Sequence, residues 1–65
     1  METDNQLVKI NLTQVNGNAF AILGAWKNAA KLQGWGPKDI SAVIEKATAG
    51  DYDHLLMTIS MHSED

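Results

Sequence analysis

Hydrophobic residues follow two different spacings along this chain, and each spacing predicts a type of element. Val8, Ile10 and Leu12 alternate with polar residues, which is the pattern of a half-buried strand. Farther along, apolar residues recur at i, i+3, i+4 and i+7, the spacing of one helix face. This spacing predicts helices over residues 19–33 and from residue 37 to a break near residue 50. The predicted core stripes are Ile22, Leu23, Trp26, Ala29 and Ala30 on the first helix and Ile40, Val43, Ile44 and Ala47 on the second.

Residues at the predicted helix ends support these boundaries. Asn16 or Asn18 is placed to cap the first helix, because a short amide accepts a hydrogen bond from an orphan backbone N–H. Pro37 suits a first helical position, where its missing N–H costs nothing. Gly50 is expected to cap the carboxyl end of the second helix.

The last segment, residues 51–62, fits two patterns. Alternation favours a strand, and it is carried by Leu55, Met57, Ile59 and Met61. Helical spacing favours a helix begun by Asp51, and it is carried by Tyr52, Leu55, Leu56 and Ile59. The Asp cap and the adjacent leucine pair make the helix the preferred interpretation.

The predicted fold is therefore α+β and mostly helical: one amino-terminal strand and then two or three short helices in a single domain of residues 1–65, with residues 1–5 frayed. If the last segment is a helix, the strand lacks a partner in its own chain and must satisfy its backbone groups elsewhere. Pairing across an oligomer interface is then expected, through Val8, Ile10 and Leu12. If the last segment is a strand, the two chain ends can pair within one subunit.

The first helix has a second face of small residues, which includes Ala21, Gly24 and Ala25. A glycine inside a helix costs about 1 kcal/mol relative to alanine, so close approach of another backbone is the expected reason for it. That backbone belongs either to the second helix of the same chain or to another subunit.

The composition limits which cross-links and binding partners are expected. The chain has 65 residues and no cysteine, so disulfides and thiolate metal sites are excluded, and a core this small usually needs help from a partner subunit. The net charge is −3 with five lysines and no arginine, which makes nucleic acid an unlikely main partner because phosphate binding depends on clustered Lys and Arg. No apolar run approaches the about 20 residues of a membrane span, and a cytoplasmic location is predicted.

Two short motifs carry candidate chemistry. Asn16, Gly17 and Asn18 precede a helix, and the N–H groups of a helix start can bind phosphate or carboxylate; a tight turn with an Asn cap is the structural alternative. Asp51, Tyr52, Asp53 and His54 gather carboxylates, a phenol and an imidazole. They could contact a ligand or simply begin a helix, and no nucleophile or oxyanion site accompanies them to suggest catalysis. No metal motif or cofactor motif is present.

Trp35 lies between two glycines, where its ring could cover the edge of the core or stack on a ligand base. Lys27 and Lys31 are one turn apart on the first helix. An anionic ligand could be held near them, although such lysines are more often a solvated face.

The motifs GNAFAILGA at 17–25 and GDYDHLL at 50–56 together resemble a family of short phage and prophage accessory proteins. The resemblance implies a phage or prophage origin and an accessory role in the host cell, and it implies no reaction. By analogy with small phage proteins that act against host defence, the first hypothesis is a non-enzymatic homo-oligomer. It would sequester a small phosphorylated, nucleotide-like ligand through the residues of the two motifs and Trp35.

Two other hypotheses remain open. One is a protein-binding inhibitor of a host defence or regulatory protein, and the other is a structural or accessory role without a ligand.

Overall fold

The computed structural model describes residues 7–64 and contains three helices and a two-stranded sheet. The helices are α1 (Ala19–Leu32), α2 (Pro37–Ala47) and α3 (Tyr52–Met61), and the strands are β1 (Val8–Lys9) and β2 (Ser63–Glu64). A short 3-10 helix, Leu12–Gln14, lies between β1 and α1. The mostly helical α+β fold is thus confirmed, whereas the predicted fraying of residues 1–5 lies outside the described residues.

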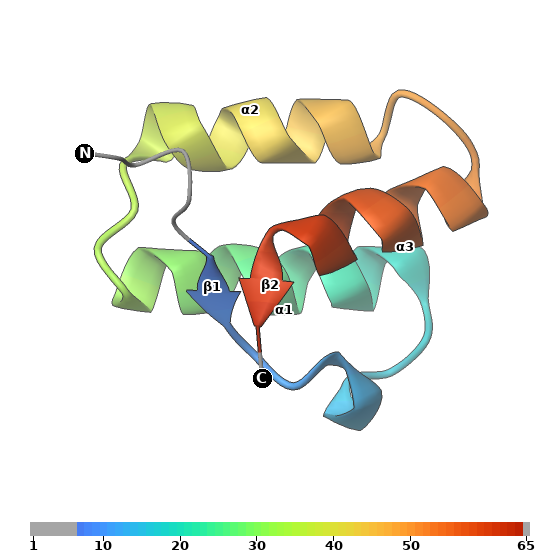
Figure 1. Ribbon diagram of the computed structural model, residues 1–65, viewed down its shortest axis with the longest axis horizontal. Helices are drawn as coiled ribbons and strands as arrows, with labels where there is room; N and C mark the ends of the chain where they lie inside the picture. The colour runs from blue at the N-terminus through green and yellow to red at the C-terminus, as the bar shows by residue number, and fades with distance from the viewer. Residues whose placement is uncertain (1–6, 65) are drawn as a thin grey trace.

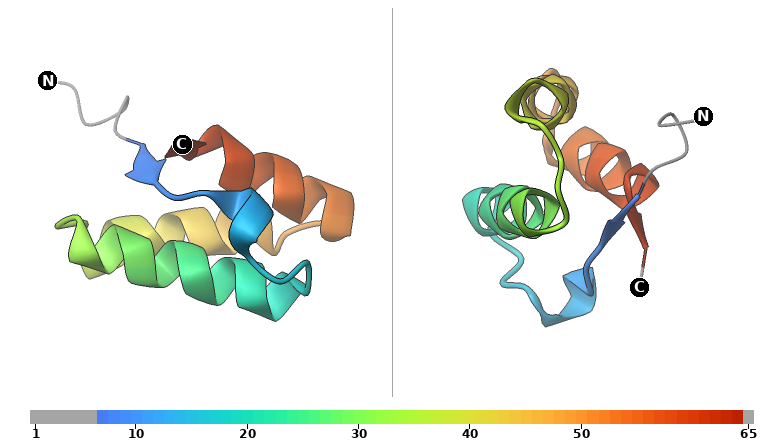
Figure 2. Two further views of the ribbon diagram at one scale, coloured as in Figure 1. Left: turned by 90° about the horizontal axis from the view of Figure 1, so that it is seen from below. Right: turned by 90° about the vertical axis from the view of Figure 1, so that its left-hand side faces the viewer.

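The three helices enclose the core. α2 runs back along α1, and α3 then returns so that α1 and α3 begin at the same end of the molecule (Figure 1). Seen from one end, the helices lie at the corners of a triangle with the strands beside α3 (Figure 2, right). Trp26 and Ile59 are the largest fully buried side chains, so the core sits where α1 meets α3. Around them are the remaining buried apolar residues, Val8, Ile22, Ala30, Ile40, Val43, Ala47 and Leu55.

The predicted helix starts are confirmed by their caps. The Asn18 side chain accepts a hydrogen bond from the Phe20 N–H, and the Asp51 side chain accepts one from the His54 N–H. Pro37 occupies the first turn of α2. Each cap satisfies a donor that the helix itself leaves free, so these residues fix where the helices begin.

The C-terminal segment is a helix, as preferred, yet the chain ends also pair. β1 and β2 are parallel, with Val8 opposite Ser63, and the Val8 N–H donates to the His62 carbonyl at 2.9 Å. The inference that a helix here leaves the first strand without a partner in its own chain is therefore wrong. The sequence pattern missed the pairing because β2 is only two polar residues long.

The outer edge of β1 is also occupied. Lys9 donates its backbone N–H to Gln33 Oε1 and accepts a bond from Gln33 Nε2, each at 2.9 Å. The amide of Gln33 therefore bonds Lys9 as a neighbouring strand would. The predicted strand over residues 8–12 also ends early, because the Asn11 side chain caps the 3-10 helix that follows.

Gly50 is not the carboxyl-end cap of α2, because Thr48 holds that position. A Cβ at Gly50 would lie 2.9 Å from the Cβ of His54. Glycine is therefore needed here for the close approach of a side chain from α3, and not for a left-handed backbone. The left-handed glycine of the chain is Gly34, with φ of 92°.

Candidate functional site

The structure brings the two sequence motifs together at one end of the molecule. The Tyr52 hydroxyl donates a hydrogen bond to the Gly17 carbonyl, which joins the start of α3 to the turn before α1. The predicted ligand-binding residues of the two motifs therefore do lie near one another.

Several polar side-chain atoms of this end are nevertheless engaged within the fold. Asn16 Oδ1 accepts the Asn18 N–H at 2.9 Å, and Asn18 Oδ1 accepts the Phe20 N–H at 2.9 Å. Asp51 and Asp53 add two carboxylates at the start of α3, where they complement its helix dipole. A phosphate approaching this end would meet negative charge, so the predicted anion site gains no support from the geometry.

His54 ties α3 to α2. Its Nε2 lies 2.8 Å from the Lys46 carbonyl oxygen, and because a carbonyl only accepts, Nε2 carries the proton in this bond. The ring rests against Gly50, where no Cβ would fit. The nitrogen that a ligand could have used thus satisfies one of the last carbonyls of α2.

Trp35 lies at the opposite end of α1 from Tyr52, and the 14-residue helix between these ends is about 21 Å long (Figure 1). The backbone N–H of Trp35 donates to the Ala30 carbonyl, and the backbone N–H of Gly34 donates to the Lys31 carbonyl. This pattern closes a helix with a hydrophobic residue two positions past the C-cap. The Trp35 ring meets Trp26 edge-to-face, with centroids 5.3 Å apart. The single chain therefore does not bring Trp35 together with the two motifs, and a site shared between subunits stays a prediction.

Asn18 acts as a helix cap, and this makes a testable prediction. Asn18→Ala is expected to lower the free energy of unfolding by about 1 kcal/mol and the Tm by about 4–8 °C, as measured by circular dichroism. Asn28→Ala is the matched control, because Asn28 is an exposed residue inside the same helix. Equal melting temperatures for the two variants would contradict the capping role.

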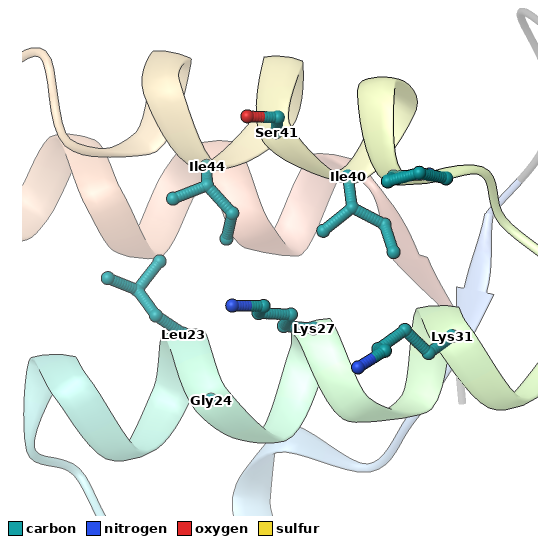
Figure 3. A pocket seen from close by; sticks show the side chains of 8 residues that line it. Leu23, Gly24, Lys27, Lys31, Ile40, Ser41 and Ile44 are labelled. Carbon is teal, nitrogen blue, oxygen red and sulfur yellow. The ribbon is translucent and has the colours of Figure 1, made fainter.

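A concave site lies elsewhere, between α1 and α2 (Figure 3). This groove has a volume of about 590 Å³, within the range of about 300–1,000 Å³ that is typical of small-molecule sites. It is lined from α1 by Leu23, Gly24, Lys27 and Lys31, and from α2 by Pro37, Ile40, Ser41 and Ile44.

The two sides of the groove differ in chemistry. Ile40 and Ile44 project from α2 toward α1, and Leu23 projects toward them (Figure 3). Lys27 extends into the space between the helices, whereas Lys31 lies along α1 one turn farther on (Figure 3). The groove therefore has aliphatic walls and a cationic rim that comes from one helix.

Two features of α1 at the groove are unfavourable for the helix itself. Gly24 sits in its interior, and nothing lies within 4 Å of a Cβ built there, so no packing within the chain requires a glycine. Lys27 and Lys31 are like charges at i, i+4, which repel by about 0.2–0.5 kcal/mol. α1 has no acidic residue to offset them. Departures of this kind from local preference are expected at functional sites.

Sequence reasoning found only part of this groove. It singled out Gly24, Lys27 and Lys31 on α1, but it assigned Ile40 and Ile44 of α2 only to the core. Ile40 is indeed buried, whereas Ile44 is half-buried and also borders the groove. Helical spacing marks the apolar face of each helix, but the opening between two helices depends on how they pack.

The predicted interface residues form two groups, one from the predicted first strand and one from the small-residue face of α1. Val8 is fully buried in the core of its own chain, where β1 contacts α1, and its predicted role at a subunit interface stays a prediction. Ile10 and Leu12 are half-buried against the same core. Of the second group, Gly24 is exposed and Ala21 and Ala25 are half-buried.

At Gly24, α2 does not make the close approach that would explain the glycine. A contact with another subunit at this face stays a prediction.

Comparison of the chain with protein-family models, with curated proteins and with solved structures gives no match. The resemblance to phage and prophage accessory proteins therefore stays a prediction. Within residues 7–64, no three His, Asp or Glu side chains gather as metal ligands. None of the helices in this part of the chain has the length and apolar character to cross a membrane.

Proposed function

We propose that this protein is a small, non-catalytic binding protein whose α1–α2 groove holds a small ligand with an apolar body and an anionic group. The observation that carries the proposal is the placement of Lys27 and Lys31 on the rim of a largely aliphatic groove. An apolar ligand body gains free energy from leaving water, and ammonium groups bind carboxylate or phosphate by charge-assisted hydrogen bonds.

The polar groups of the groove suit binding better than catalysis. They are two lysines and the hydroxyl of Ser41, and general acid–base chemistry at neutral pH calls for a group such as an imidazole or a carboxyl within reach of the substrate. The His54 ring is held instead by the Lys46 carbonyl.

The small phosphorylated, nucleotide-like ligand expected from the sequence shares its anionic group with the proposed class. In this proposal its phosphate meets Lys27 and Lys31 in place of the turn at Asn16–Asn18. Sequestration of a host signal by a phage protein remains one biological use of such a groove.

The test uses anilinonaphthalene sulfonate, a fluorescent probe with an apolar body and one anionic group. We expect saturable binding of one probe per chain by the folded protein. Lys27→Gln combined with Lys31→Gln should weaken binding by about 2- to 30-fold, since each exposed ion pair contributes about 0.2–1 kcal/mol.

The matched control is Lys9→Gln combined with Lys46→Gln, which removes the same charge from exposed positions outside the groove. Its affinity for the probe should equal that of the unmodified protein. Absence of saturable binding, or an equal loss in both double variants, would contradict the proposed function.

Exposed apolar side chains favour a second candidate, a contact with another protein. Phe20 and Leu32 on α1 are 84% and 88% exposed, and Met57 and Met61 on α3 are 62% and 67% exposed. If Phe20→Ser and Leu32→Ser abolish binding to a partner protein and leave probe binding unchanged, protein binding is the better description.

A further inference from the structure

The side chains that line the groove indicate which kind of uncharged body the ligand has, and they do so more clearly than the volume of the groove. Its uncharged walls are aliphatic, formed by Leu23, Ile40, Ile44 and Pro37, and no aromatic ring is among the described lining residues. Proteins usually hold nucleobases by stacking them on aromatic or guanidinium planes and by bonding their polar edges. Here Ser41 supplies the single uncharged hydrogen-bonding side chain of the lining.

Phe20 is exposed and is not among the described lining residues of the groove, and the other three aromatic residues are used elsewhere in the fold. Trp26 is fully buried and packs against Trp35, and Tyr52 is bonded to Gly17. An aliphatic wall instead suits a flexible hydrocarbon, which needs apolar contact and no directional bonds.

The cationic rim indicates where the charged end of such a ligand would lie. Lys31 is at one end of the α1 side and Leu23 at the other, and Lys27 lies between them with its amine in the space between the helices (Figure 3). Eight residues separate Leu23 from Lys31, a rise of about 12 Å along a helix. This length suits an extended chain with its head at the lysines. Phe20, 84% exposed, lies one turn beyond Leu23, where a longer chain would emerge.

We propose that the ligand of the groove is an anionic acyl or alkyl amphiphile, with its hydrocarbon chain between Leu23, Ile40 and Ile44 and its carboxylate or phosphate head at Lys27 and Lys31. This inference rests on the proposed function and specifies its ligand class. An anionic head also offsets the repulsion between the two lysines, and Gly24 leaves open space beside the chain.

The test is a titration of the isotopically labelled protein, followed by backbone-amide NMR below the micelle concentration of each probe. Four probes separate the chemistries: decanoate and decyl phosphate have chain and anion, methyl decanoate has the chain alone, and adenosine monophosphate has the anion on an aromatic body. We expect both anionic amphiphiles to shift the amides of the groove residues saturably. Their relative affinities distinguish a carboxylate head from a phosphate head.

Lysine variants test whether the amphiphile binds at this groove. Lys27→Gln with Lys31→Gln should raise the Kd of decanoate by about 2- to 30-fold, and Lys9→Gln with Lys46→Gln should leave it unchanged. Methyl decanoate should bind the unmodified protein more weakly than decanoate by a similar factor.

Each contrary outcome has a distinct meaning. Adenosine monophosphate shifting the groove amides at lower concentration than decanoate would overturn the acyl inference and leave the proposed function standing. Equal affinity for decanoate and its methyl ester would overturn the role of the lysines as head-group ligands. Failure of every probe, anilinonaphthalene sulfonate included, to perturb the groove would overturn both proposals.

Discussion

Trp26→Ala is expected to unfold most or all of the protein at room temperature. The Trp26 side chain is fully buried, and truncation of a buried tryptophan to alanine costs about 3–5 kcal/mol. A domain with 65 residues has a total stability of about 3–10 kcal/mol. One truncation therefore removes a large part of the free energy of unfolding.

Trp26 does more than fill volume. Its Nε1 donates to the His62 carbonyl at 3.3 Å, and the same carbonyl accepts the Val8 N–H at 2.9 Å. The indole thus anchors the point at which α3 ends and the two strands pair. Trp35, half-buried against it, loses its packing partner in the alanine variant.

Trp26→Phe separates these contributions. Phenylalanine keeps an aromatic ring in the core and removes the bond to His62, so we expect an intermediate loss of stability by urea denaturation. Trp35→Ala is the matched control for loss of an indole, and it should cost less because Trp35 is only half-buried. A Trp26→Ala variant as stable as Trp35→Ala would contradict the placement of the core.

The helices were predictable because their signals are local. Capping residues such as Asn18 and Asp51 and the apolar spacing within each helix act within a few residues of chain. The pairing of β1 with β2 was not predictable, because Ser63 and Glu64 carry no apolar alternation and lie 55 residues from their partners in the register. The hydrogen bonds between Gln33 and Lys9 were unpredictable for the same reason, since the two residues are 24 positions apart in the sequence.

The candidate site shows a different limit. Asn, Asp and His side chains near a helix start have the same chemistry whether they bind a ligand or cap the helix. The sequence motifs at residues 16–18 and 51–54 were therefore open to either interpretation. The structure engages Asn16, Asn18 and Asp51 in backbone bonds. Gly24 and the lysine pair were visible in the sequence, but the aliphatic wall opposite them depends on how α2 packs.

Gly24→Leu is expected to increase stability and to weaken binding in the groove. Replacing a glycine inside a helix gains about 0.5–1 kcal/mol from helix propensity. Because nothing in the described part of the chain lies within 4 Å of a Cβ at this position, the first carbon of the new side chain meets no obstacle there. The Tm should rise by several degrees, at about 4–8 °C per kcal/mol for a domain of this size.

The same side chain would occupy the space that the ligand needs. Overpacking a site costs about 1–3 kcal/mol, so the affinity for anilinonaphthalene sulfonate and for decanoate should fall about tenfold or more. Gly24→Ala is the matched control: it brings the gain in helix propensity with much less bulk, so it should stabilise the protein and keep most of the binding.

Opposite changes in stability and affinity would be difficult to attribute to partial unfolding, which lowers both together. If Gly24→Leu stabilises the protein and binding is unchanged, the ligand does not lie against α1 at this position. If the variant is less stable than the unmodified protein, Gly24 is required by a contact that the single chain does not contain, and a second copy packed on this face becomes the better explanation. Thermal unfolding and probe titration on the same three proteins therefore decide whether Gly24 serves a ligand or a subunit.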